Sequence, residues 1–549
     1  MTAPTAQPVR STLRRTSPLG DAFHVFDTTL RDGAQREGIT YSVADKIAVA
    51  TLLDELGVGF IEGGWPGAMP KDTEFFARAA AGELALTTAR LVAFGATRKA
   101  GVRADADPQV RALLDSGAEV ITLVAKSDVR HVERALRTTL DENLAMVADT
   151  VRLLVDHGRR VFLDCEHFFD GYAADRDYGL RVAEAAVGAG ADVVVLCDTN
   201  GGMLPLGIHE VVSNVLQRTG FRLGIHCQDD TGCAVANTVA AVQAGATHVQ
   251  CTANGYGERA GNADLFPVLG NLITKLGLPV LPEGRLSELM RVSHALAELA
   301  NIAPNTHQAY VGSSAFSHKA GLHASAIKVD PELYNHLDPK VVGNDQHILI
   351  TEMAGRASVE LKAAELGVSL AGRPEVVGTV VETVKQREAQ GWSYEAADAS
   401  FELLLRAELA ASGGQERVLP FVLESYRVIV EHRVGEVTSE ATVKVHVGGE
   451  RVIATAEGNG PVNALDSALR LALTERLPQV SQVELTDYKV RILAGHAGTD
   501  SVTRVLVTST AGLREWTTVG VHANVVEASW QALVDSLVYA LESVEEQSA

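Results

Sequence analysis

Residues 26–38 read FDTTLRDGAQREG, a short apolar lead-in followed by a dense group of charged, amide and hydroxyl side chains. Asp32 offers a hard oxygen ligand for a cation, and the neighbouring Arg31 offers a planar fork for a carboxylate. A strand that ends in such a group is suited to holding a metal ion and an anionic substrate. On these residues alone, a solvated turn after an edge strand is an equally good interpretation.

Seven further apolar segments follow, separated by segments with helical periodicity. They are GFIEGGWP (59–66), LVAFGAT (91–97), EVITLVAKS (119–127), RVFLDCEHF (160–168), DVVVLCDTN (192–200), RLGIHCQDD (222–230) and THVQCTANG (247–255). Continuous Val, Ile and Leu runs are typical of strands buried on both faces. With HVFDTTL (24–30) they make eight strand–helix units, which predict an α/β fold, a (β/α)8 TIM barrel.

Polar side chains stand at the carboxyl end of nearly every run. They are Arg31, Asp32, Glu62, Lys126, Glu166, Asp198, Thr199, Asn200, His226, Gln228 and Asn254. In such a barrel these ends converge on one mouth, where active sites lie. Independent surface turns would not repeat polar groups at the same relative position, so the pattern predicts one shared site. Helix capping is an alternative role for the segment 198–200.

Size and composition narrow the class of protein. A chain of 549 residues is too long for one core, and a net charge of −21 disfavours nucleic acid and anionic membranes as partners. The charge does not exclude an anionic small substrate, because a local arginine or metal overrides the global field. The five cysteines form no CxxC pair, which suggests free thiols in a reducing cytoplasm. No apolar run is long enough to span a bilayer.

The sequence divides into four parts. Residues 1–21 carry Arg, Ser, Thr and Pro and are expected to form a disordered tail, with only a faint likeness to a transit peptide. The barrel is expected over 22–285, and helical linker subdomains over 286–410. The stretch 314–327, SAFSHKAGLHASAI, interrupts those helices with two histidines beside glycines. It suggests a loop that reaches over a site, although a plain surface loop fits its composition equally well.

After a linker at 411–417, residues 418–545 alternate as strands and contain two amphipathic helices. VNALDSAL (462–469) and VEASWQAL (526–533) match in spacing, which predicts a duplicated β–β–β–α unit. A small duplicated α+β domain without a catalytic residue cluster suits ligand sensing or dimerisation.

Several motifs together resemble the isopropylmalate, homocitrate and citramalate synthase family. They are DTTLRDGAQREG, DTNGG (198–202), NGYGERAGN (254–262) and the duplicated C-terminal unit. IEGGWPGAMPKD (61–72), EHFFDGY (166–172) and AFSHKAGLHASAI (315–327) are most similar to the longer, citramalate-forming type within it. The resemblance covers about residues 22–545.

The resemblance implies a Claisen-type condensation by an acyltransferase. Acetyl-CoA would react with a 2-oxoacid, pyruvate as first choice, to give (R)-citramalate and CoA in isoleucine biosynthesis. It further implies a cytoplasmic homodimer and an amino-acid effector, isoleucine or leucine, bound by a LeuA-type allosteric domain at 418–545.

The resemblance also implies roles for single residues. Asp32 and His226 match metal ligands, and Asn254 matches the amide near the metal. Arg31 matches the residue that stabilises the oxyanion, and Thr199 matches a contact to the 2-oxoacid carboxylate. Glu166 matches an acidic residue near the acetyl-CoA methyl group. His323 matches the histidine of proton transfer, acting in cis or in trans, and Tyr334 matches its partner.

One position departs from the family pattern. The family carries HxHN after the seventh strand, whereas this chain has His226-Cys227-Gln228-Asp229. The oxygen of Gln228 can bind a hard cation but is a weak donor to Zn²⁺, and Asp229 adds a carboxylate that could compensate. We therefore expect Gln228 among the ligands of a divalent metal, Mg²⁺ or Mn²⁺ rather than Zn²⁺.

Three other functions stay open at this stage. One is a 2-isopropylmalate-synthase-like condensation with another 2-oxoacid. The second is a carbon–carbon lyase of the same barrel superfamily, although such lyases usually lack the duplicated domain. The third is a non-catalytic amino-acid sensor whose metal site has degraded through Gln228.

Overall fold

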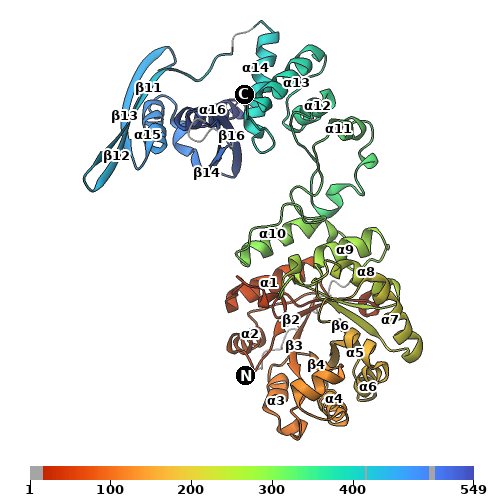
Figure 1. Cartoon of the computed structure of the whole chain (residues 1–549). Helices are drawn as coiled ribbons and strands as arrows, with labels where there is room; N and C mark the ends of the chain where they lie inside the picture. The colour runs from red at the N-terminus through yellow and green to blue at the C-terminus, as the bar shows by residue number, and fades with distance from the viewer. Residues whose placement is uncertain (1–16, 415–416, 494–500, 549) are drawn as a thin grey trace, which may run out of the picture. The chain divides into compact units, whose positions relative to one another are not determined.

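The computed structural model describes residues 17–414, 417–493 and 501–548. The chain forms two compact units, one of residues 1–316 and 337–345 and the other of residues 317–336 and 346–549. Figure 1 shows the barrel in the first unit and helices with antiparallel sheets in the second. The region expected as helical linker, 286–410, is shared between the units. Helix α10 (Leu289–Leu299) belongs to the first unit, and the helices from α11 (Gly321–Ile327) to α14 (Asp398–Ser412) belong to the second.

Eight parallel strands close into a barrel in the order β1 to β8, which confirms the predicted fold. They are β1 (His24–Asp27), β2 (Phe60–Gly64), β3 (Arg90–Ala96), β4 (Val120–Lys126), β5 (Arg160–Glu166), β6 (Val193–Asp198), β7 (Leu223–Cys227) and β8 (His248–Cys251). β1 pairs with both β2 and β8 and so closes the ring. Every residue of β1, β2, β6, β7 and β8 is buried, as the continuous apolar runs predicted.

Helices surround the strands and cover their outer face (Figure 1). They are α1 (Val43–Leu56), α2 (Pro70–Ala80), α3 (Pro108–Asp115), α4 (Leu140–Asp156), α5 (Phe168–Ala174), α6 (Arg176–Gly188), α7 (Pro205–Thr219), α8 (Ala234–Gln243) and α9 (Leu265–Thr274). Local sequence sets their ends. α1, for example, starts at a capping box of Ser42 and Asp45 and stops at Gly57, which has a φ of 102°.

An apolar layer fills the barrel interior and separates its two openings. It consists of buried side chains from β1 to β6, namely Phe26, Phe60, Val92, Val120, Phe162, Val193, Val195 and Cys197. The barrel is therefore a packed core and not a pore, and polar chemistry is confined to its ends.

Two buried histidines lie at the amino-terminal end of the barrel. The Nδ1 atoms of His24 and His248 are 3.1 Å apart, and the rings are 1% and 0% exposed. Nε2 of His24 lies 2.8 Å from Arg222 and 3.2 Å from Arg160. Burial and these two guanidinium groups lower the pKa of His24 to about 4, and burial holds the pKa of His248 well below its usual value.

The free energy of unfolding is therefore expected to fall as the pH drops from about 6.5 to about 4. In this window the unfolded chain protonates its histidines while the folded barrel keeps His24 neutral, a difference of about 3 kcal/mol for that residue. Urea unfolding at about pH 5 and about pH 7 measures the slope, and His24→Gln should reduce it. An unchanged slope in that variant would contradict the assignment.

The second unit contains β9 (Ser317–His318), α11 (Gly321–Ile327), β10 (His347–Ile348), α12 (Arg356–Glu365), α13 (Pro374–Ala389) and α14 (Asp398–Ser412). Two antiparallel three-stranded sheets follow. β11 (Phe421–Arg433), β12 (Glu436–Val447) and β13 (Glu450–Gly458) precede α15 (Pro461–Thr474), and β14 (Glu484–Ile492), β15 (Thr503–Ala511) and β16 (Arg514–His522) precede α16 (Val525–Ser548).

The two halves of this domain repeat the same architecture. Each has its register shift near the start of its first strand, between Leu423 and Ser425 in one and between Leu485 and Asp487 in the other. The predicted β–β–β–α duplication is confirmed.

The predicted tail, 1–21, lies outside the described residues up to residue 16. From Gly20 to Ala22 the chain forms a short 3-10 helix, and the Asp21 carboxylate accepts a 2.7 Å hydrogen bond from Arg160. This end of the expected disordered tail is therefore ordered and contacts the amino-terminal end of the barrel. Within the described ranges, no helix has the length and apolarity needed to cross a membrane.

Candidate active site

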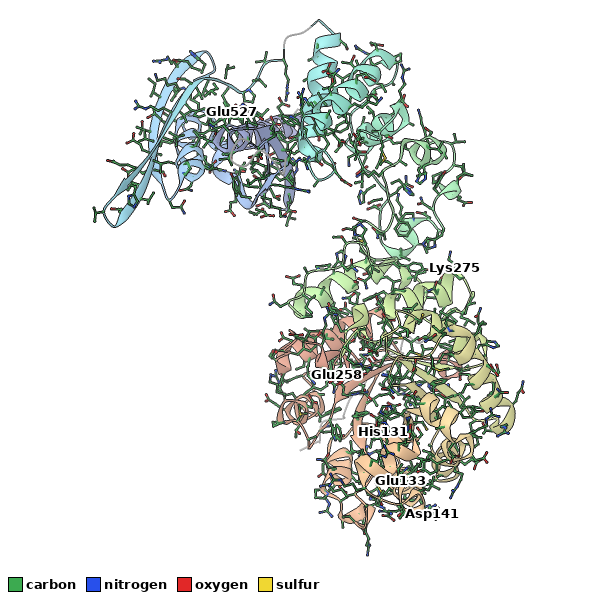
Figure 2. The ribbon with its side chains drawn as sticks, in the orientation of Figure 1. His131, Glu133, Asp141, Glu258, Lys275 and Glu527 are labelled. Atoms are coloured by element: carbon green, nitrogen blue, oxygen red, sulfur yellow. The ribbon has the colours of Figure 1, made fainter. Side chains whose placement is uncertain are left out.

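A cavity of about 420 Å³ opens at the carboxyl ends of the barrel strands. Seven of the residues singled out in the sequence line it, namely Arg31, Asp32, Lys126, Glu166, Thr199, His226 and Gln228. Glu258, which Figure 2 labels on the barrel unit, contributes from the loop after β8. The strand ends thus meet at one cavity.

Asp32, His226 and Gln228 form a compact buried cluster in this cavity. Oδ2 of Asp32 lies 3.2 Å from Nε2 of His226 and 3.2 Å from Nε2 of Gln228, and the last two atoms are 3.5 Å apart. The three residues are 5–7% exposed. They meet because β1 and β7 both end here, with Asp32 on the turn after β1 and Gln228 directly after β7.

The electrostatic surroundings of the cluster keep the Asp32 carboxylate ionised. Burial disfavours the carboxylate, but the Arg31 guanidinium and hydrogen bonds from His226 and Asn262 outweigh it and hold the pKa of Asp32 well below its usual range. Burial likewise works to lower the pKa of His226, and the hydrogen bond to Asp32 raises it above the usual value. Asp32 is therefore an anion, and His226 faces it with Nε2.

A chain of hydrogen bonds fixes the His226 ring. Its Nδ1 lies 2.8 Å from Oε1 of Gln250, and the amide of Gln250 donates to Asp164 at 2.9 Å. Because an amide oxygen accepts only, Nδ1 carries a proton, and Nε2 is the ring atom that faces Asp32. Metal-binding histidines are commonly held in this way.

Asp164 also lines the cavity, although no motif in the sequence marked it as a site residue. Burial, with the Glu62 carboxylate adding to it, raises the pKa of Asp164 to about 7. Residues two apart on a strand share a face, so the inward Glu166 already indicated that Asp164 points into the barrel.

The donor set suits a divalent cation. Oε1 of Gln228 and Oδ1 of Asn262 are buried and have no hydrogen-bond partner. An isolated β-bridge pairs the backbones of the two residues, which places both amides beside Asp32. Among the described residues no group of three or more His, Cys, Asp or Glu side chains gathers to hold a metal. Amide oxygens would therefore have to complete the set, and they favour a hard cation.

Asn254, expected near the metal, is used elsewhere. Its amide donates to the Ser293 carbonyl at 3.0 Å and its oxygen accepts from the Ser293 hydroxyl at 2.6 Å, which ties the loop to α10. Asn262, at the other end of the NGYGERAGN motif, lies beside Asp32 instead.

Asp229 does not supply the compensating carboxylate. Its Oδ1 accepts the backbone N–H of Ala234 at 2.8 Å, at the start of α8. Asp198 is also occupied by backbone, since it accepts from the N–H groups of Gly202 and Met203 at 3.1 Å each. These N–H groups belong to the loop before α7 (Pro205–Thr219), so Asp198 braces that loop and does not cap the helix, as the capping alternative for 198–200 would require.

Arg31 is held on three sides. Its Nε donates to Oε2 of Glu62 at 2.7 Å, its Nη1 lies 3.3 Å from Oδ1 of Asp32, and its guanidinium lies 3.9 Å from the centre of the Phe94 ring. Glu62 is fully buried and also accepts from Thr28 at 2.6 Å. Although burial opposes the charge, Glu62 and Asp32 raise the pKa of Arg31 above its usual value.

Glu166 pairs with Lys126 at the ends of β5 and β4. The next residue, His167, has a φ of 59°, and its N–H donates to Oγ1 of Thr199 at 2.8 Å. Its ring stacks on His131, labelled in Figure 2, with centres 3.8 Å apart. Thr199 is thus fixed at the cavity by the strand next to its own.

His323 and Tyr334 belong to the second unit. Their rings stack with centres 4.1 Å apart, and the neighbouring His318 bonds to Asn335 at 2.9 Å. The two residues thus form a stacked ring pair, and their part in proton transfer stays a prediction.

Three family models match the chain. They are HMGL-like over residues 22–296, the homocitrate synthase post-HMGL domain-like model over 310–391 and the LeuA allosteric (dimerisation) domain over 395–541. The last match gives the C-terminal region a family known for dimerisation and regulation.

Curated relatives match over nearly the full length. The chain is 66% identical to an (R)-citramalate synthase of Streptomyces coelicolor over 96% of this chain and 98% of that protein. It is 46% identical to an (R)-citramalate synthase of Synechocystis sp., with 94% and 96% covered. A 2-isopropylmalate synthase of Methanocaldococcus jannaschii is 30% identical, with 94% of each chain covered. By fold, cavity and this likeness, the chain belongs to the (R)-citramalate synthase family.

Proposed function

We propose that this protein condenses acetyl-CoA with pyruvate to give (R)-citramalate and CoA. The observation that carries the proposal is the buried Asp32–His226–Gln228 cluster with Arg31 beside it, in a barrel with citramalate-synthase relatives at up to 66% identity. The place of this reaction in isoleucine biosynthesis is part of the proposal. The lyase alternative fits less well, because a LeuA-type domain follows the barrel.

Asp32, His226 and the amide oxygens of Gln228 and Asn262 are the residues that would hold a divalent metal. When bound, such an ion would supply Lewis-acid polarisation of the keto group of a 2-oxoacid. With two or more oxygen donors and one imidazole, we propose Mg²⁺ or Mn²⁺ rather than Zn²⁺. The uncompensated amide oxygens argue against a degraded site.

Residues of the chain itself bind the 2-oxoacid and stabilise the negative charge that develops on its oxygen. Arg31, pre-oriented by Glu62 and Phe94, donates to the oxygen that becomes an alkoxide when the new carbon–carbon bond forms. Thr199 contacts the acceptor carboxylate. Phe94, Val124 and Leu136 line the cavity with apolar surface that suits a methyl group.

Proton removal from the acetyl-CoA methyl group falls to His323, assisted by Tyr334, acting in cis or in trans. Glu166 is the weaker candidate because its carboxylate is already engaged in an ion pair with Lys126. Hydrolysis of the thioester then releases CoA and makes the reaction irreversible.

Release of free CoA, followed with a thiol-trapping reagent, tests the function. We expect continuous release with acetyl-CoA and pyruvate that requires Mg²⁺ or Mn²⁺. 2-Oxoisovalerate, the larger acceptor, should react far more slowly. No release with any 2-oxoacid would reject the proposal in favour of a sensor or a lyase.

His323→Ala is expected to abolish CoA release while leaving 2-oxoacid binding largely intact. The cluster that binds the acceptor lies in the barrel unit, whereas His323 belongs to the second unit. Turnover and calorimetric binding of pyruvate measure the two effects, and His318→Ala is a control on the same loop. Wild-type turnover of His323→Ala would remove this residue from the mechanism.

The C-terminal domain bears on the oligomeric state and the effector, and the cysteines bear on the cellular compartment. We propose a homodimer whose LeuA-type domain binds isoleucine or leucine as effector. The five cysteines are free thiols, which suits a cytoplasmic enzyme. Light scattering and inhibition by each amino acid test these points.

A further inference from the structure

Trp65 borders the cavity on the loop after β2 and is fixed at several points. Its backbone N–H donates to Oδ2 of Asp72 at 2.8 Å, and Asp72 pairs with the buried Lys46. Its indole meets the Phe94 ring edge-on, with centres 5.3 Å apart. Its Nε1–H donates to Oε1 of Gln109 at 2.8 Å.

Gln109 lies on α3, outside the residues that line the cavity. Helix α3 is packed close to the Trp65 loop, since a Cβ on Gly67 would come within 2.4 Å of Cβ of Ala112. Gln109 also donates to the Gly67 carbonyl at 3.4 Å, a weak bond. The acceptor atom for the indole therefore sits on a helix that is itself held against the loop.

The Trp65–Phe94 pair stands next to the groups that would hold the keto acid. Arg31 lies over Phe94 at 3.9 Å and reaches Asp32 at 3.3 Å. An acceptor whose carbonyl is held at Arg31 and Asp32 thus has these two rings beside it. Lys126 and Glu166 come from the ends of two other strands, β4 and β5, and do not belong to this aromatic pair.

We propose that Gln109 is a positioning residue for acceptor selectivity. By holding the indole of Trp65 against Phe94, it fixes a rigid aromatic wall that accepts the methyl group of a short 2-oxoacid and excludes longer side chains. This inference rests on the proposed function. A hydrophobic pocket distinguishes one methylene by about 10- to 200-fold only while its wall keeps its place.

The test compares pyruvate with 2-oxobutyrate, which is longer by one methylene. Gln109→Leu removes the acceptor for the indole N–H, and we expect the ratio of the two kcat/KM values to fall about tenfold, mainly through a lower KM for 2-oxobutyrate. Gln109→Glu keeps an acceptor oxygen and should retain the wild-type ratio within about twofold. Gln217→Leu, an exposed site on α7, controls for the substitution itself.

Two outcomes overturn the inference. One is a ratio in Gln109→Leu that stays at the wild-type value, including the case in which both kcat/KM values fall equally, as a merely structural role would give. The other is a ratio that falls just as far in Gln109→Glu, which keeps the acceptor oxygen. Calorimetric binding of both acids in the presence of Mn²⁺ distinguishes failure of this inference from failure of the proposed reaction. If the wild type binds the acids without releasing CoA, the proposed reaction fails and the ratio of the two Kd values tests the wall. A wild type that binds neither acid overturns both.

Discussion

Asp32→Asn should lower kcat/KM for CoA release by at least about 1,000-fold and abolish tight Mn²⁺ binding. The substitution keeps the shape of the side chain but removes the one full negative charge in the cluster, which also contains His226 and two amides. A single lost charge-stabilising group in a preorganised site costs about 100- to 1,000-fold, and here the lost group also anchors the cation. Thiol-trapping kinetics and Mn²⁺ paramagnetic resonance measure the two effects.

Asp229→Asn is the matched control. It makes the same chemical change close to Gln228 in the sequence, but this carboxylate accepts the backbone N–H of Ala234, the first residue of α8. The amide oxygen of asparagine can accept the same N–H, so activity, Mn²⁺ affinity and stability should stay near wild type. Wild-type Mn²⁺ binding by Asp32→Asn, or its loss in Asp229→Asn alone, would contradict the assignment of the ligands.

The barrel and the location of its site could be predicted from the sequence because both follow from short-range periodicity. Continuous apolar runs give strands buried on both faces, and a polar residue after each run falls at one mouth. Arg31, Asp32, Glu166, Thr199, His226 and Gln228 reach the cavity for that reason alone. The second β–β–β–α unit could be predicted because it repeats the first.

Loop conformation explains why the sequence did not predict which asparagine lies beside Asp32. Asn254 and Asn262 stand at the two ends of one motif, and only the bend between them decides which faces Asp32. Gly261 has a φ of 100°, and a Cβ there would lie 2.0 Å from the Gly255 carbonyl oxygen. The loop therefore folds back on itself and returns Asn262 to the bridge with Gln228. No periodic signal encodes such a turn.

Side-chain contacts between segments far apart in the chain could not be predicted from the sequence either. Gln109 and Trp65 are 44 positions apart, and Gln250 reaches Asp164 across 86. Neither pair belongs to a recognised motif, since each joins side chains that only barrel closure or helix packing brings together. Function in this molecule depends on such supports, because they fix the groups that touch substrate.

Arg31→Gln is the second large-effect prediction, and it should affect activity and stability together. Loss of the guanidinium that faces the developing alkoxide is expected to cost about 100- to 1,000-fold in kcat. It also leaves Glu62, which is fully buried, with only the Thr28 hydroxyl as partner. Removing one partner of a buried ion pair typically costs about 3–5 kcal/mol of unfolding free energy.

The double variant Arg31→Gln, Glu62→Gln separates the two effects. It removes the buried charge that Arg31 neutralised, so urea unfolding should return most of the way to wild type. CoA release should stay as low as in the single variant, because no donor replaces the guanidinium. Arg31→Lys should recover little activity, since an ammonium group cannot donate in a fork to Glu62 and the alkoxide while lying flat on Phe94. Recovery of turnover in the double variant would mean that Arg31 serves only to neutralise Glu62, and the oxyanion role would then have to pass to another group.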